Sequence, residues 1–284
     1  MRLYVAGTYA EIWNGGRLDG LLYPVDRGGF ESVPSGGRRT HDMGVLEQRG
    51  GFDHGIASRV NMLESFYYIQ PWQTELIPYL KSFLLDSGGY TLRRGKGDVA
   101  DWDGYLTRYI DYINENDVKL FFDLDIDGVV GYQGVLRFRE RLERETGKRS
   151  IPVWHMSYGK QEWLDLCDEY GYVALGGLAH AAGRRQMEKY VPWFLKEAHR
   201  RGTKVHILGY TPAGNLMSCG ADSVDSSAWL YGNRGRFIYR WDGRTMRKID
   251  VPEGKRMVSR EVARHNFIEW VKMGEALEGA SSGV

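Results

Sequence analysis

The chain of 284 residues lacks several features that define common classes of protein. It has two cysteines, Cys167 and Cys219, and neither lies in a CxxC pair, so one chain can build neither a disulfide framework nor a cysteine zinc site. No apolar run approaches the roughly 20 residues that a membrane helix needs. The first residues, MRLYVAGTYAEIW, also lack the apolar core of a signal peptide. These absences predict a cytoplasmic protein without a membrane partner.

The chain also lacks a large excess of charge of either sign. The 38 Lys and Arg residues nearly balance the 37 Asp and Glu residues, which leaves a net charge of +1. Any surface for a nucleic acid must therefore be a local basic patch. Aromatic residues make up 13% of the chain, which is enough both for a core and for rings that stack on bases.

Three familiar catalytic motifs are absent as well. No GxGxxG follows the first strand, which weakens a dinucleotide-binding interpretation, and DSGGY is not the GxSxG elbow of a serine hydrolase. The histidines form no HxH or HExxH metal pattern.

What is present is a regular alternation of strand-like and helical patterns from Met62 onward. The strand-like runs are LKSFLLD, VKLFFDLD, IPVWHM, YVALGG, KVHILG and ADSVDS. Alternation of this kind predicts parallel strands with helical crossovers. Together with the length, it predicts an α/β fold in which residues 1–284 form a single catalytic domain, a TIM (β/α)8-type barrel.

The expected helices show apolar residues at spacings of three and four. Asp101 can cap the first, over residues 102–116, and Gly171 ends the second, over residues 160–170. The third runs over residues 184–201 and Pro192 can kink it, and the last spans residues 259–277. The charged run RFRERLERETGKR favours an ordinary charged helix.

The two ends of the chain look irregular. Residues 1–60 are rich in glycine and contain one expected strand, Leu3 to Val5, so the rest of this segment is predicted to form long loops. Residues 278–284 are predicted to be a flexible tail.

Acidic residues and glycines follow the expected strands. In a barrel the strand ends meet in one pocket, so residues far apart in sequence come together there. The strand ends are Asp86, the trio Asp123, Asp125 and Asp127, His155, Gly176 with Gly177, Gly209, and Asp225. Two carboxylates suit sugar chemistry, in which one traps an oxocarbenium-like centre and the other moves a proton. Asp86 and Asp225 would form such a pair if the barrel closes.

The segment DLDIDG, residues 123–128, opens like a calcium loop. The twelfth position, which should be glutamate, is Gly134, and a strand-like run precedes the segment, so calcium is disfavoured. A magnesium cluster of Asp123, Asp125 and Asp127 stays open as an alternative. His155 is compatible with either a structural or a ligand-binding role.

Four motifs occur in the order seen in tRNA-guanine transglycosylases. They are LLDSGGY at 84–90, ALGGLA at 174–179, HILGYTPAGNL at 206–216 and GADSVDSS at 220–227. With VDSSAW and a short chain, the sequence more closely resembles the 7-deazaguanine DNA transglycosylases of phages and genomic islands. The resemblance covers about residues 60–235.

This resemblance implies a TIM barrel that exchanges guanine for a 7-deazaguanine without cutting the backbone and without a cofactor or metal. It implies that Asp225 is the nucleophile, Asp86 the general acid and base, and Tyr90 the ring that stacks on the base opposite Leu208. The implied substrate-binding residues are Ser87, Gly88, Tyr90, Asp123, His155, Gly176, Gly177, Leu178, Leu208 and Gly209. A carboxylate suits the N–H donors of a guanine-like edge, and backbone N–H groups suit its carbonyl.

Two departures favour DNA over tRNA as the partner, beside the free 7-deazaguanine base. The tRNA enzymes carry a cysteine-rich zinc subdomain after the nucleophile, and this chain has no cysteine after Cys219. It also has SSAWLYGNRGR where they have C-x-x-P-T-R. The alternative functions are a tRNA-guanine transglycosylase, a metal-dependent barrel hydrolase, and a silent nucleic-acid-binding relative. A homodimer is compatible with the sequence.

A basic segment follows Asp225. Residues 233–248 interleave arginines with aromatic residues, which predicts a β-rich insertion that presents Arg234, Arg236, Arg240 and Arg244 to phosphates. A solvated β-ribbon is the alternative.

Overall fold

The computed structural model describes residues 1–8, 57–89, 91, 101–179, 181–210, 219–235, 237–250 and 259–281. Much of the loop-rich segment predicted over residues 1–60 lies outside this part of the chain, as does Tyr90.

The main sheet has seven parallel strands in the order β3-β2-β1-β7-β6-β5-β4. The strands are β1 (Arg2–Ala6), β2 (Asn61–Ser65), β3 (Ser82–Asp86), β4 (Val153–Trp154), β5 (Tyr172–Leu175), β6 (Lys204–Ile207) and β7 (Ser223–Ser226). Parallel strands are expected when each strand returns through a crossover. The α/β fold with a parallel sheet is thus confirmed.

The sheet is curled into a half-barrel, and its two faces are both buried. Alternate residues of a strand point to opposite faces. On one face they pack with helix residues in the large core, as Leu3 and Val5 do. On the other face, Tyr4, Ala6, Leu63, Leu84, Phe122, Ile151, Val153 and Ala174 form a second cluster built from strand and bridge residues alone. We call this second face the inner face. Its side chains pack against one another from different strands, which requires the sheet to curl.

A short segment links the two edges of this sheet. Single parallel bridges join Leu85 of β3 to Phe121, and Phe122 to Ile151 just before β4. The Tyr109 hydroxyl donates to the Phe122 carbonyl oxygen at 2.9 Å and holds this segment from outside. The predicted strand over VKLFFDLD is therefore reduced to these bridges.

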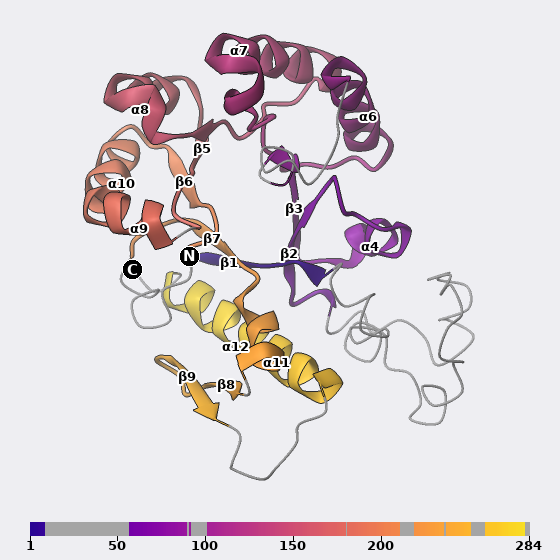
Figure 1. Ribbon diagram of the computed structural model, residues 1–284, viewed down its shortest axis with the longest axis vertical. Helices are drawn as coiled ribbons and strands as arrows, with labels where there is room; N and C mark the ends of the chain where they lie inside the picture. Colours follow the sequence, from indigo (N-terminus) through magenta and orange to yellow (C-terminus); the bar gives the residue numbers. More distant parts are fainter. Residues whose placement is uncertain are drawn as a thin grey trace.

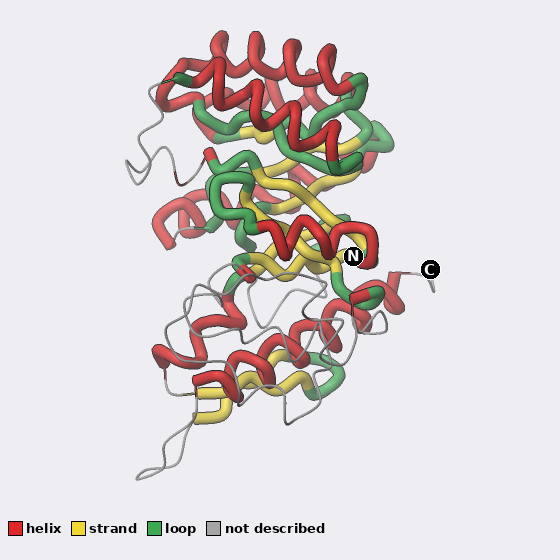
Figure 2. The backbone as a smooth tube through the Cα atoms, turned by 90° about the vertical axis from the view of Figure 1, so that its right-hand side faces the viewer, coloured by secondary structure: helices red, strands yellow, loops and turns green. Residues whose placement is uncertain are grey.

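Helices lie around the sheet (Figures 1 and 2). They are α4 (Pro71–Leu76), α6 (Trp102–Glu115), α7 (Asp127–Thr146), α8 (Gly159–Glu169), α9 (Ala181–Met187), α10 (Val191–Arg200), α11 (Gly232–Gly235) and α12 (Ser259–Ser281). The short 3-10 helices are η2 (Ile77–Tyr79), η3 (Met156–Tyr158), η4 (Glu188–Tyr190) and η6 (Ala228–Tyr231). Helices α6, α7, α8 and α10 follow one another along the outer face of the sheet, and α12 packs on the same face, against Leu3 and Val5 of β1 (Figure 1).

Two helix predictions are confirmed closely. Helix α6 begins after Asp101, whose carboxylate accepts a hydrogen bond from the Gly104 N–H at 2.9 Å, as its role as a cap requires. Helix α8 ends two residues before Gly171. The charged run after Gly134 is helical too, as the second half of α7.

Other local predictions are wrong. Pro192 does not kink one long helix: it occupies the first turn of α10, where a missing N–H costs nothing, and α9 and η4 precede it. Asp127 does not lie at a strand end as predicted, because it begins α7. Strand β2 was not predicted, because Asn61 and Glu64 interrupt its apolar pattern.

The predicted tail starts too early. Helix α12 continues to Ser281, and its Glu278 accepts a hydrogen bond from Asn61 of β2 at 2.7 Å and pairs with Lys81. This anchor to the sheet extends the last helix past the predicted boundary at residue 278.

A two-stranded antiparallel hairpin, β8 (Phe237–Trp241) and β9 (Met246–Asp250), follows β7 in the chain. The predicted β-rich insertion is thus present, although residues 233–235 belong to α11. Helix α12 lies between the hairpin and the sheet (Figures 1 and 2). Across the described residues, no helix combines the length and the hydrophobicity needed to cross a membrane.

Candidate active site

Two predicted catalytic aspartates lie at the carboxyl end of the curled sheet. Asp86 is the last residue of β3, and Asp225 lies in β7, with β2 and β1 between these strands. Both have the parity of the inner face, because Leu84 belongs to the inner cluster and Tyr4 of that cluster lies opposite Asp225 in the register. The curl turns the two carboxylates toward the same space.

Burial shapes the electrostatics of Asp86. The pKa of this carboxyl is raised from 3.8 to about 6: burial is the main cause, the charges of Asp125 and Asp225 add to it, and a hydrogen bond from the Gly88 N–H opposes the rise. That N–H donates to Asp86 Oδ2 at 3.0 Å. A carboxyl with this pKa can both give and take a proton near neutral pH.

The hydrogen bonds that described residues make to Asp225 go to one of its oxygens. Its Oδ1 accepts from the Gly209 N–H at 2.7 Å and contacts His206 Nε2 at 3.2 Å. The residue is 9% exposed. Gly209 has φ of +61°, a left-handed conformation that favours glycine and that directs its N–H at the carboxylate.

Asp123 does not face this space. Its Oδ2 accepts from Arg139 Nε at 2.8 Å and its Oδ1 accepts from the Val153 N–H at 3.0 Å. Burial raises the pKa of Asp123, and the Arg139 guanidinium opposes that rise. With 1% exposure and both oxygens engaged, Asp123 is placed as an internal ion-pair partner, and this geometry argues against the predicted role in reading a base.

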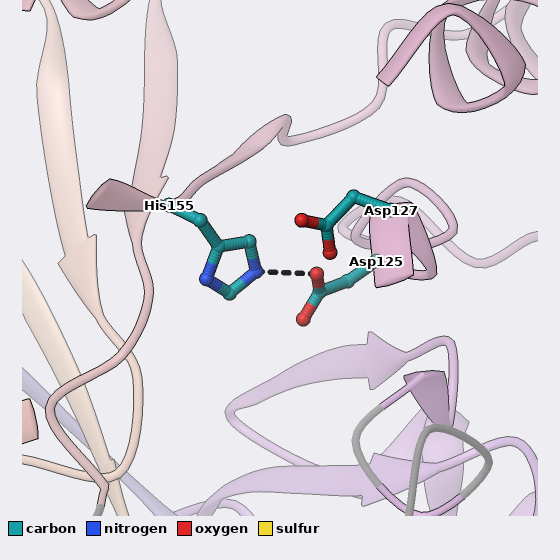
Figure 3. Close-up of side chains that lie close together, drawn as sticks. All are labelled: Asp125, Asp127 and His155. Atoms are coloured by element: carbon teal, nitrogen blue, oxygen red, sulfur yellow. Dashed lines mark hydrogen bonds and ion pairs between the residues drawn. The ribbon is translucent and has the colours of Figure 1, made fainter. Parts of the chain in front are cut away.

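Asp125 differs from Asp123 in its surroundings. Its charge acts on Asp86, its carboxylate makes a short hydrogen bond with His155 Nε2, and its carbonyl oxygen lies against Gly89. Asp127 lies at the start of α7, and its carboxylate points toward Asp125 and His155 (Figure 3).

Asp125, Asp127 and His155 could together hold a metal ion. One ligand atom from each lies within 4.8 Å of the others. The donor set of two carboxylates and one imidazole suits Zn²⁺ or Mn²⁺ better than Ca²⁺, which takes oxygen ligands alone. The predicted cluster of Asp123, Asp125 and Asp127 is therefore not the group that the fold assembles.

The glycines near the site are required by the protein's own packing. A Cβ on Gly88 would lie 2.8 Å from Tyr67 Cβ, and one on Gly89 would lie 2.3 Å from the Asp125 carbonyl oxygen. A Cβ on Gly176 would lie 2.6 Å from the His155 ring. These positions accept only glycine because neighbouring segments approach them, whatever ligand the site takes.

The other predicted binding residues fall in different surroundings. Ser87 is buried, and its carbonyl oxygen accepts from the Tyr105 hydroxyl at 2.6 Å. The Leu178 side chain is fully buried in the large core, while Leu208 is half-buried and packs against the inner cluster. Gly177 has φ of +87°, and a Cβ there would meet nothing within 4 Å.

The hairpin displays part of the predicted basic surface. Arg240 and Arg244 are exposed, and Arg240 lies directly opposite Arg247 in the register, so both point to one face. Arg236 and the side chain of Arg234 lie outside the described residues.

Sequence reasoning missed His206 and its partners. The histidine is 0% exposed, and its Nδ1 lies 2.6 Å from Ser223 Oγ, which in turn contacts the Tyr172 hydroxyl. A signal existed: His206 stands within the apolar run KVHILG, where a buried polar side chain needs a partner.

No family model and no curated protein matches the chain. Two solved structures of the carboxyl transferase domain of Rhizobium etli pyruvate carboxylase resemble it weakly. The domain with oxalate matches at a TM-score of 0.46 and 12% identity, over 97% of this chain and 48% of that chain. The domain with pyruvate matches at a TM-score of 0.40 and 12% identity, over 78% and 42%. The chain spans less than half the length of either. Similarity at this level says nothing about its activity, substrates or partners.

Proposed function

We propose that this protein is a DNA guanine transglycosylase, which exchanges guanine for a 7-deazaguanine through a covalent aspartyl-sugar intermediate. One observation carries the proposal: two carboxyl groups, Asp86 with its raised pKa and the hydrogen-bonded Asp225, interact electrostatically at the carboxyl end of one curled sheet. Retaining glycosidic chemistry needs such a pair.

In the first half-reaction, Asp225 attacks C1′ of the deoxyribose as the C1′–N9 bond breaks. The bonding electrons leave with guanine, and protonated Asp86 gives its proton to the departing base. The products are a neutral guanine, an ester between Asp225 and C1′, and an ionised Asp86. A pKa of about 6 supports this role, because a fraction of the carboxyl is still protonated near neutral pH and can give its proton to a leaving group.

The second half-reaction reverses these roles. A 7-deazaguanine enters, ionised Asp86 takes its N9 proton, and N9 attacks C1′. The ester breaks, and Asp225 recovers its carboxylate. Because charge and protons balance over the cycle, the exchange consumes no cofactor.

Asp125 is the better placed carboxylate for the base. It neighbours Asp86 electrostatically and is 8% exposed, whereas Asp123 is paired with Arg139. The N–H donors of a guanine-like edge would bind Asp125, with Leu208 on one face of the ring.

The closed (β/α)8 barrel is the finer architecture that we propose. Residues 120–123 would act as the remaining strand. The bridges of Phe121 to β3 and of Phe122 to Ile151 support this closure, as does the inner cluster to which Phe122 contributes.

DNA is the proposed polymer, and the hairpin its proposed contact. Arg240 and Arg247 share an exposed face, where they would bind phosphates. Such contacts would hold the DNA without distinguishing its base sequence.

The test is base exchange with guanine-radiolabelled single-stranded DNA, duplex DNA and tRNA, each supplied with 7-cyano-7-deazaguanine and a chelator. Release of label from DNA in the presence of the chelator, absent in Asp225→Asn, is the expected result. Release from tRNA alone would transfer the proposal to tRNA, and full activity of Asp225→Asn would refute the covalent mechanism.

A metal-dependent hydrolase is the second candidate, favoured by the approach of Asp125, Asp127 and His155. In that case a chelator would abolish activity, Mn²⁺ or Zn²⁺ would restore it, and Asp127→Asn would weaken metal binding measured by calorimetry. Base exchange that a chelator leaves intact would argue against this candidate.

A further inference from the structure

A chain of buried polar side chains leads from the inner face of the sheet to Asp225. His206 of β6 contacts Asp225 Oδ1 through Nε2 at 3.2 Å and Ser223 Oγ through Nδ1 at 2.6 Å. Ser223 Oγ then contacts the Tyr172 hydroxyl of β5. His206 is 0% exposed and Ser223 is 2% exposed, so water does not supply these partners.

The chemistry of the groups fixes the direction of this chain. An ionised carboxylate only accepts hydrogen bonds, so His206 must carry its proton on Nε2 when Asp225 is ionised. In a neutral imidazole Nδ1 is then an acceptor, and Ser223 donates to it. The Ser223 oxygen in turn accepts from Tyr172, which keeps its proton because burial raises its pKa. Tyr172 thus donates to Ser223, Ser223 donates to His206 Nδ1, and His206 carries its proton on Nε2.

Packing holds the imidazole in place. The Tyr4 ring lies edge-on at 6.0 Å and the Phe122 ring lies tilted at 5.2 Å, measured between ring centroids. Both belong to the inner cluster. A ring held between them keeps Nε2 directed at Asp225.

We propose that His206 is a positioning residue for Asp225, an inference that rests on the proposed function. His206 Nε2 and the Gly209 N–H occupy Oδ1, and the hydrogen bonds recorded for this carboxylate within the described residues all go to that oxygen. Oδ2 is thereby assigned as the atom that attacks C1′. Once the ester forms, Oδ1 is its carbonyl oxygen, and the same two donors stabilise the charge that returns to it as the ester breaks.

The experiment follows formation of the covalent protein–DNA adduct in single turnovers with a guanine-containing oligodeoxynucleotide. His206→Phe should slow adduct formation about 100-fold, the scale of losing one positioned donor. His206→Gln, whose amide can donate from a similar place, should recover part of the rate. Ser223→Ala should fall between, because the tautomer of His206 is no longer fixed.

Thr203→Val is the matched control. Thr203 is a buried hydroxyl beside β6, and it donates to the Cys167 and Tyr170 carbonyl oxygens, away from Asp225. This variant should form adduct at the wild-type rate. Folded His206→Phe with a wild-type rate would overturn the proposal, as would equal losses in His206→Gln and His206→Phe.

A second readout separates this inference from the proposed function. Nitrogen-15 NMR of the histidines should place the His206 proton on Nε2 in the wild type, and Asp225→Ala should change that signal. If the wild type forms no adduct with any polymer, the base-exchange proposal fails, yet a proton on Nε2 still supports the positioning of Asp225. A proton on Nδ1 overturns it.

Discussion

Asp86 is half-buried at the end of β3, and its carboxyl has a raised pKa. Burial raises its pKa to about 6, above the ordinary 3.8. The native state therefore holds this proton more tightly than the unfolded chain does. The stability that Asp86 contributes is fully present below about pH 3.8 and is lost as the pH rises through about 6.

Asp86→Asn should therefore lose activity and gain stability at high pH. An amide cannot move the proton, so adduct formation should fall at least about 100-fold. At pH 8 the variant should be more stable than the wild type by on the order of 2 kcal/mol, and near pH 4 the two should be equal. Urea unfolding at both pH values measures the difference. A variant that is less stable at pH 8 would show that the ionised carboxylate is well accommodated.

Asp123 and Arg139 form a pair whose separation should be costly. Asp123→Asn leaves the Arg139 guanidinium buried without its counter-charge, so the free energy of unfolding should drop by about 3 kcal/mol. Asp123→Leu combined with Arg139→Met removes both charges and should recover much of the loss. Urea unfolding of the single and double variants measures the coupling. Normal stability with lost base affinity in Asp123→Asn would restore the role that the sequence suggested.

At the scale of elements, the turn after β6 serves the end of β7. Gly209 closes β6 with φ of +61°, and its N–H reaches across to Asp225. A Cβ there would lie 2.6 Å from Ala179 Cβ, so an added methyl group must move the turn. The position of the Asp225 carboxylate thus depends on the turn that follows the neighbouring strand.

Gly209→Ala should lower adduct formation by about 100-fold, because the donor to Asp225 is displaced. Gly202→Ala is its control, since Gly202 has φ of +76° but a Cβ there would meet nothing within 4 Å. Both changes carry backbone strain of about 1 kcal/mol, and only the first should slow the reaction. Equal rates in the two variants, measured in the adduct assay, would remove the Gly209 N–H from the mechanism.

At the scale of the whole molecule, α12 separates the sheet from the hairpin. Asn266 of α12 is 0% exposed; it accepts from the Tyr239 N–H at 2.8 Å and donates to the Trp229 carbonyl oxygen at 3.0 Å. The hairpin is thereby attached to α12 through Tyr239. Its outer face carries the exposed Arg240 and Arg247, and Arg247 pairs with Asp242.

Neutralising that face should weaken DNA binding in a salt-dependent way. Arg240→Gln with Arg247→Gln should reduce the slope of log affinity against log salt by about 2, since each phosphate contact contributes about 0.9. Arg200→Gln, an exposed arginine on α10, is the control with an unchanged slope. Fluorescence anisotropy over a range of salt concentrations makes the measurement. An unchanged slope in the double variant would place the DNA elsewhere.

The sequence by itself determined the local elements and the residues at their ends. Periodicity and capping within α6 and α8 act over neighbouring residues, so they can be read without the fold, and so can the placing of Asp86 and Asp225 on strands. Interrupted patterns were harder: β2 carries Asn61 and Glu64, which hide it.

Tertiary structure alone decided which side chains share a site. Asp123, Asp125 and Asp127 look alike in sequence, yet Arg139 takes the first, His155 contacts the second, and the third begins a helix. The contact between His206 and Asp225 likewise joins residues of two different strands. The curl of the sheet sets these contacts between residues distant in sequence, and a local pattern of residues carries no record of distance in space.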